Sequence, residues 1–130
     1  VLTIAGTASL PQLPSSVTTL HAYIVESRLV FDRGESGSPG SSITLLGRLM
    51  FHADLPDSAA RRSWNLHAKL AERVHVGADR YIQNWVTRAL TPDSPPARGM
   101  PEMRFPDERA LVERFFDSDR GRDEILQDTA

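Results

Sequence analysis

The sequence contains no cysteine, so disulfides, iron–sulfur clusters and thiolate metal sites are excluded. It also has no apolar run near the roughly 18 residues that are needed to span a bilayer, so we expect no membrane partner. Charge of neither sign dominates, because the formal net charge is -2 over 130 residues, and no basic stripe of the kind carried by nucleic-acid-binding domains is visible. We therefore expect a cytoplasmic protein of one domain that does not bind nucleic acid.

Several catalytic signatures are missing as well. The chain has no Gly-x-Ser-x-Gly elbow and no glycine-rich phosphate loop, so nothing in it supports nucleophilic catalysis or nucleotide binding. No two histidines have the spacing of metal ligands on a helix or a strand. A metal site would need His67 together with distant carboxylates, and we expect none.

What the sequence does contain is a series of short periodic segments. Residues 1–17 are rich in small residues and read as an irregular N-terminal segment, and 18–130 read as one domain. Within that domain, residues 18–31 have the composition of a strand, and the glycine- and serine-rich residues 32–42 read as a flexible linker. The core unit, 43–130, is predicted to contain strands at 43–53, 80–90 and 99–105. A first helix is predicted to run from an N-cap at Asp57 or Ser58 to about Val74. A second helix is predicted to start at Pro106-Asp107 and to be interrupted near Ser118.

This order predicts an α+β fold with a ferredoxin-like, four-stranded antiparallel sheet and two helices on one face. The core unit is one strand short of that fold. Either residues 18–31 supply the missing edge strand, or the strand comes from a segment beyond Ala130. Residues 43–53 are apolar on both faces, so we expect the uncovered sheet face to pair with a second copy in a homodimer.

The predicted first helix carries a histidine on its apolar stripe. Spacings of three and four residues place Ala60, Trp64, His67, Ala71 and Val74 on one helical face. His67 is therefore predicted to point inward, where an imidazole serves either as a general acid or base in a cleft or as a core histidine bonded to a carbonyl. The sequence leaves both interpretations open, and the remaining histidines give weaker signals.

Four segments together resemble the EthD family of dimeric α/β barrel proteins. They are the helix motif W-x-x-H-A-x-L-A at 64–71, the strand R-Y-I-Q-N at 80–84, the glutamate-containing strand G-M-P-E-M-R-F at 99–105, and S-D-R-G-R at 118–122 followed by Asp128. The resemblance covers about residues 43–130. It implies a ferredoxin-like unit that pairs with a second copy to form a barrel, has no organic cofactor, and uses a helical histidine at the position of His67. Asp128 matches an acid of the family, although a carboxylate in a terminal turn is most often solvated.

Other side chains could complete a site around His67. Tyr81 could act in catalysis by orienting a substrate oxygen, although a strand tyrosine more often packs in the core. The candidate substrate-binding residues are Trp64, His52, Asn84 and Trp85. Core packing is the ordinary role for both tryptophans, and His52 also reads as a half-exposed residue at the end of a strand.

Three functions remain open from the sequence. The first is a small cofactor-independent enzyme that moves a proton on an apolar, oxygenated, aromatic or polyketide-like substrate, as an isomerase, cyclase or dehydratase. The second is a non-catalytic ligand-binding or accessory protein of a catabolic oxygenase system, since relatives implied by the resemblance include such proteins. The third is a dimerisation module without a ligand.

Overall fold

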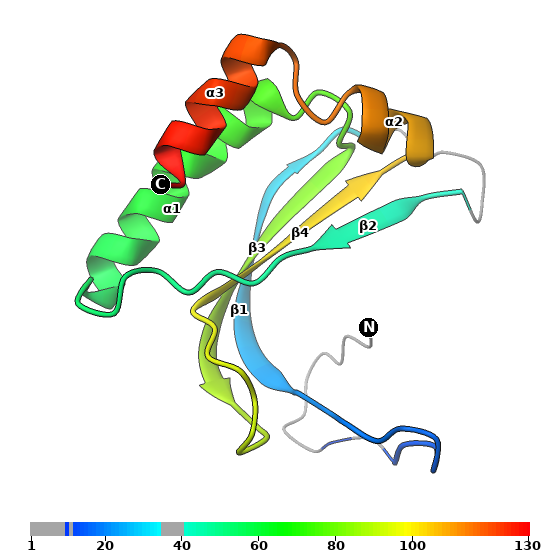
Figure 1. Cartoon of the computed structure of the whole chain (residues 1–130), viewed down its shortest axis with the longest axis vertical. Coiled ribbons are helices and arrows are strands. Elements are labelled where there is room, and N and C mark those ends of the chain that lie inside the picture. Colours follow the sequence, from blue (N-terminus) through cyan, green and yellow to red (C-terminus); the bar gives the residue numbers. More distant parts are fainter. Residues whose placement is uncertain (1–9, 11, 35–40) are drawn as a thin grey trace.

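A four-stranded antiparallel sheet with helices packed on it forms the protein. The structure is a computed structural model and describes residues 10, 12–34 and 41–130. The strands are β1 (Tyr23–Asp32), β2 (Ile43–Leu46), β3 (Arg80–Ala89) and β4 (Gly99–Phe105), and their order in the sheet is β1-β3-β4-β2. Every neighbouring pair is antiparallel (Figure 1), so the predicted α+β class is confirmed, and the architecture is compatible with a ferredoxin-like fold.

Three helices are observed where two were predicted: α1 (Asp57–Val74), α2 (Glu108–Glu113) and α3 (Asp119–Asp128). The predicted second helix is divided because each half has an N-cap of its own. Asp107 accepts a bond from the backbone N–H of Ala110, at 2.8 Å, and Ser118 accepts one from Gly121, at 3.0 Å. The chain therefore turns at Ser118, and α3 runs alongside α1 (Figure 1).

The core lies between one face of the sheet and the helices. Along β3, Tyr81, Gln83 and Trp85 are buried, whereas the intervening side chains are only partly covered. Tyr81 belongs to a larger cluster that also contains Ala68 of α1 and Ala110 of α2, so both helices cover this same face. Trp85 belongs to a second cluster with Ala60 and Trp64 of α1.

β1 lies at the edge of the sheet, beside β3. β2, α1 and β3 form a split βαβ unit, because β4 separates the two strands. A complete ferredoxin-like fold has a second split βαβ unit, which here would start with β4 and continue through the helices that follow it. Its last strand would lie at the edge of the sheet next to β2. β1 occupies the opposite edge, and no described residue fills the position beside β2.

β2 is much shorter than the predicted strand 43–53. It ends at Leu46. Beyond that point the N–H of Gly47 still donates to the backbone oxygen of Pro101 in β4, at 2.9 Å, and Leu49 forms an isolated bridge with Gly99. Pro101 of β4 lies opposite the point where β2 ends, and a proline has no N–H to donate to a neighbouring strand. In addition, a Cβ atom on Gly47 would lie 2.8 Å from Cγ of Pro101, which shows how closely the backbone of Gly47 approaches the proline ring.

The start and end of α1 depend on residues from outside the helix. The predicted N-cap was wrong, because Pro56 occupies that position and no side chain caps it. Asp57 instead accepts a bond of 2.6 Å from Arg98. At the other end, Arg33 donates to the carbonyl oxygens of Glu72, His75 and Ala78, at 2.6, 3.0 and 2.7 Å. A cation at the C-terminus of a helix opposes its negative dipole end, so Arg33 fixes where α1 stops.

Two predictions fall partly outside the described residues. The predicted irregular segment 1–17 includes residues 1–9 and 11, and the predicted linker 32–42 includes residues 35–40. Within the described part of the chain, no helix is both long enough and apolar enough to cross a membrane.

Candidate functional site

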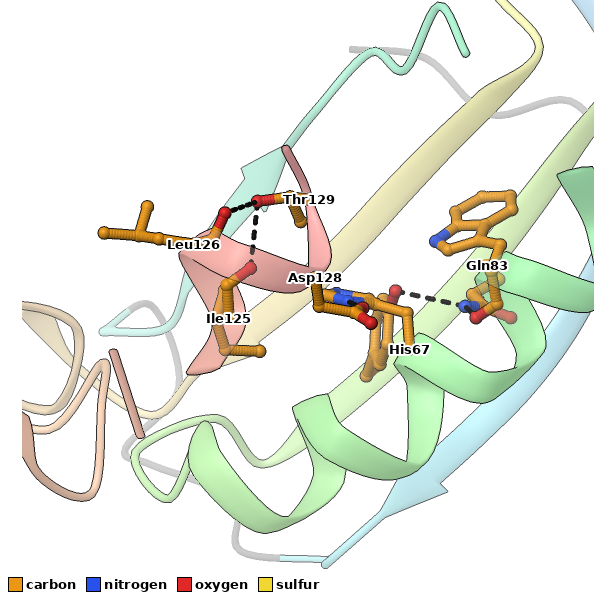
Figure 2. Close-up of polar contacts among 8 residues, drawn as sticks. His67, Gln83, Ile125, Leu126, Asp128 and Thr129 are labelled. Carbon is orange, nitrogen blue, oxygen red and sulfur yellow. Dashed lines mark hydrogen bonds and ion pairs between the residues drawn. The ribbon is translucent and has the colours of Figure 1, made fainter. Parts of the chain in front are cut away.

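His67 and Asp128 form the one histidine–carboxylate pair among the described residues. Nδ1 of His67 lies 2.6 Å from Oδ2 of Asp128, and the side chains are 14% and 42% exposed. Figure 2 shows Asp128 reaching from the end of α3 toward His67 on α1. A carboxylate only accepts hydrogen bonds, so Nδ1 carries the proton and Nε2 is left with its lone pair when the ring is neutral. No described residue bonds Nε2.

Close packing of α3 on α1 brings Asp128 to this position. Gly121 lies against Val74 of α1, and a Cβ atom at Gly121 would lie 3.1 Å from Val74 and 1.9 Å from the carboxylate of Asp117. Ile125 is buried one turn later, and Glu124 forms an ion pair with Arg73 of α1. The exposed end of α3 is thereby held over the middle of α1, where His67 lies.

Tyr81 is buried beneath this region, with only 1% of its surface exposed. Its hydroxyl oxygen accepts a bond of 3.3 Å from the side-chain amide of Gln83, and the same amide donates to the backbone oxygen of Trp64 at 2.8 Å. Burial raises the pKa of the Tyr81 hydroxyl above its ordinary value of 10.0, and the hydrogen bond from Gln83 offsets part of that effect. Tyr81 is therefore protonated at neutral pH, and its ring forms part of the core.

Gln83 is a polar residue of this region that lies in the R-Y-I-Q-N segment but was not among the candidate site residues. It is 3% exposed, and its amide links β3 to the backbone of α1 one turn before His67 (Figure 2). Its side-chain oxygen also accepts from Arg28 of β1 at 3.5 Å. The sequence could have pointed to Gln83, because side chains alternate between the two faces of a strand. Residues 81, 83 and 85 must therefore share one face, and Gln83 lies between two aromatic residues on it.

The two candidate tryptophans pack against each other. The ring centroids of Trp64 and Trp85 are 6.3 Å apart, and Phe51 lies 6.1 and 5.8 Å from them. Trp64 and Trp85 are 5% and 6% exposed. These rings fill a core cluster at the N-terminal half of α1, and Arg61 covers Trp85 from outside at 4.5 Å.

The other two candidate residues lie away from His67. Asn84 faces the uncovered side of the sheet, where its side chain accepts from Ser27 of β1 at 2.6 Å and donates to the backbone of Met100 at 3.1 Å. His52 is exposed in the loop before α1, and its backbone oxygen accepts from Arg98. Of the six candidates, the structure therefore places His67, Tyr81 and Trp64 in one region, with Trp85 beside Trp64.

His75 is the most buried histidine, with 3% of its surface exposed. Its Nδ1 donates to the backbone oxygen of Phe115 at 2.7 Å, and its ring packs on Phe115 and Phe116. Burial lowers the pKa of His75 below its ordinary value of 6.5, and the bond to Phe115 opposes that effect. This neutral imidazole fixes the end of α1 against the chain between α2 and α3.

His67 lines neither of two surface grooves that the described residues form. One, of about 480 Å³, lies between α1 and β1, and the other, of about 310 Å³, lies between α2 and α3. Among the described residues, no three histidine, aspartate or glutamate side chains lie close enough to hold a metal ion. The chemistry available at His67 is therefore that of an imidazole and a carboxylate.

None of the protein-family models, curated proteins or solved structures compared with the chain matches it.

Proposed function

We propose that the chain is an EthD-like, cofactor-independent enzyme in which His67 transfers a proton on an apolar, oxygenated substrate. The observation that carries this proposal is the contact between Nδ1 of His67 and Asp128. A carboxylate on one ring nitrogen fixes the tautomer and stabilises the imidazolium that forms when the other nitrogen takes a proton. The positions of the four EthD-like segments, on α1, β3, β4 and the start of α3, give further support.

The proposed reaction needs no group outside the chain. Nε2 removes a proton from a carbon next to a carbonyl, and the electron pair of the C–H bond moves into the carbonyl to form an enolate. The imidazolium, paired with Asp128, then returns the proton to the γ-carbon, where a neighbouring double bond has extended the enolate into a dienolate, or to a hydroxyl group on the β-carbon, which leaves as water. The first outcome is an isomerisation and the second a dehydration.

Proton exchange tests the proposal without knowledge of the natural substrate. Activated C–H groups of β-diketones and lactones are followed by NMR in deuterated water, with and without the protein. We expect the protein to accelerate exchange for at least one compound, and His67→Asn to lower that acceleration by about 10²-fold or more while the compound still binds. His21→Asn, at an exposed histidine that is not a candidate site residue, is the control and should keep the full rate.

A ligand-binding protein without turnover is the second candidate function. It is favoured by the placement of His67, which lines neither groove. On this account a small apolar ligand binds, no exchange is accelerated, and His67→Asn changes the affinity alone. The exchange experiment therefore separates the two functions.

We also propose that the protein is a homodimer that buries the uncovered face of the sheet. Leu29 on this face is 54% exposed and lies opposite Ile82, and Val86 and Met100 lie further along the same face, each only partly covered. Adjacent apolar side chains on one open face are typical of an interface. Sedimentation at micromolar concentration should give twice the monomer mass, and Ile82→Glu should give the monomer. A wild-type monomer at these concentrations would exclude the dimer.

A further inference from the structure

The groove between α1 and β1, which we name the basic groove, gathers cationic side chains from both elements. Its lining includes Arg28 of β1 and Arg61, Arg62, Asn65 and Lys69 of α1. Lys69 is two positions beyond His67 and so points roughly 200° away from it around the helix. The basic groove is therefore separate from the His67 site, and binding there is independent of the proton transfer proposed for His67.

Three of the four cations in the basic groove have no carboxylate partner among the described residues. Arg61 is paired with Glu26 at 2.7 Å. Arg28 bonds only to the neutral side chains of Asn65 and Gln83, and neither Arg62 nor Lys69 has a described partner. Elsewhere most arginines face an aspartate or glutamate, as Arg98 and Arg104 do. The basic groove therefore carries a local positive charge on a chain whose net charge is -2.

The basic groove borders the outer edge of the sheet through Arg28 of β1. β1 pairs with β3 on one side, and no described strand pairs with it on the other. Its register is irregular at Ile24/Val25 and again at Leu29/Phe31, and between these points five residues, 25–29, follow a regular register. Glu26 and Arg28 in this run direct their side chains toward α1. An open strand edge thus lies directly beside uncompensated cations.

We propose that the basic groove docks an acidic, extended segment of a partner protein, which adds a strand to the outer edge of β1. Backbone hydrogen bonds to residues 25–29 would hold the segment, and carboxylates on its helix-facing side would meet Arg28, Arg62 and Lys69. The groove is broadly open, so it suits an extended chain better than a small molecule, which is normally enclosed on most sides. Three free cations are also few for a nucleic-acid-binding surface.

A matched pair of double variants tests the proposal. The probe is a dye-labelled peptide of about seven residues in which glutamate and valine alternate, and binding is followed by fluorescence anisotropy. We expect Arg62→Gln with Lys69→Gln to weaken binding about tenfold. The control, Arg48→Gln with Arg88→Gln, removes the same charge from two exposed residues that also lack a described partner, and should change binding less than about twofold. None of these four side chains has a described hydrogen bond, so folding should be preserved.

The chain contains a single lysine, Lys69, which gives a second readout. The bound peptide should slow the reaction of this amine with an acylating reagent and the hydrogen exchange of amides 25–29. Replacing glutamate with lysine, or methylating alternate backbone nitrogens, should abolish binding. The proposal is overturned if the peptide does not bind, if the lysine peptide or a single-stranded oligonucleotide binds as well, or if a second copy of this chain protects Lys69 instead.

Discussion

Nδ1 of His67 lies 2.6 Å from Oδ2 of Asp128, although 61 positions separate the two residues in the sequence. The pair exists because α3 returns along α1 after the turn at Ser118. The carboxylate of Asp128 lies at the exposed end of α3, whereas the imidazole of His67 is largely covered. Any change that loosens α3 should therefore disturb the pair before it disturbs the sheet.

Asp128→Asn tests whether the carboxylate supports the imidazole. The amide keeps the size of the side chain but cannot stabilise an imidazolium by charge. We expect proton-exchange activity to fall by about 10²-fold, with unchanged thermal unfolding, because Asp128 lies at an exposed helix end. Full activity in this variant would show that the contact has no catalytic role. Asp123→Asn, on the same helix, is the control.

Gly121→Ala should detach α3 from α1. The added methyl group would overlap the carboxylate of Asp117 and press on Val74, so the helix must shift. We expect a loss of about 1–3 kcal/mol in the free energy of unfolding, measured with denaturant, together with loss of the His67–Asp128 contact. Arg120→Ala, whose side chain is 90% exposed in the same helix, should cost far less.

The buried imidazole of His75 should make stability depend on pH. Its folded-state pKa is lowered by burial, whereas in the unfolded chain it returns to about 6.5. Between these two values the unfolded state binds the proton more readily, so the free energy of unfolding should fall as pH drops below about 6.5 toward the folded pKa. His75→Asn keeps a donor for the oxygen of Phe115 and should reduce this slope. A slope unchanged by His75→Asn would assign it to other groups.

Arg33 should stabilise α1 from outside the helix. Arg33→Met keeps an apolar stem over the ring of Phe31 but removes the donors to three carbonyl oxygens. We expect a loss of about 1–2 kcal/mol in the free energy of unfolding and faster amide exchange in the last turn of α1. Arg48→Met serves as the matched exposed control. Equal stability of the two variants would contradict this role.

Local patterns predicted much of the fold. The bounds of α1, β3 and β4 follow from periodicity and from the prolines and glycines between them, and the apolar stripe of α1 placed His67 inward. The length of β2 was not predictable in the same way, because it depends on Pro101 in another strand. The interruption of the second helix near Ser118 was predicted, and the structure shows that Asp107 and Ser118 each cap one of the two resulting helices.

The candidate site was predicted less completely, for two different reasons. Tyr81 and Asn84 are three positions apart on a strand and so face opposite sides of the sheet, which alternation alone could have shown. The partner of His67 could not be found locally, because it depends on how α3 packs. Gln83 was overlooked although it lies in the R-Y-I-Q-N segment, because a glutamine side chain does not titrate and so does not stand out as a candidate for proton transfer.

The tautomer of His67 tests the central claim most directly, because the proposed base is Nε2. In protein labelled with ¹⁵N, the ring nitrogens of His67 are distinguished by NMR at a pH where the ring is neutral. The account predicts a protonated Nδ1 and an unprotonated Nε2, and a mixture of tautomers in Asp128→Asn. A proton on Nε2 in the wild-type protein, or a tautomer that does not respond to the loss of the carboxylate, would contradict it.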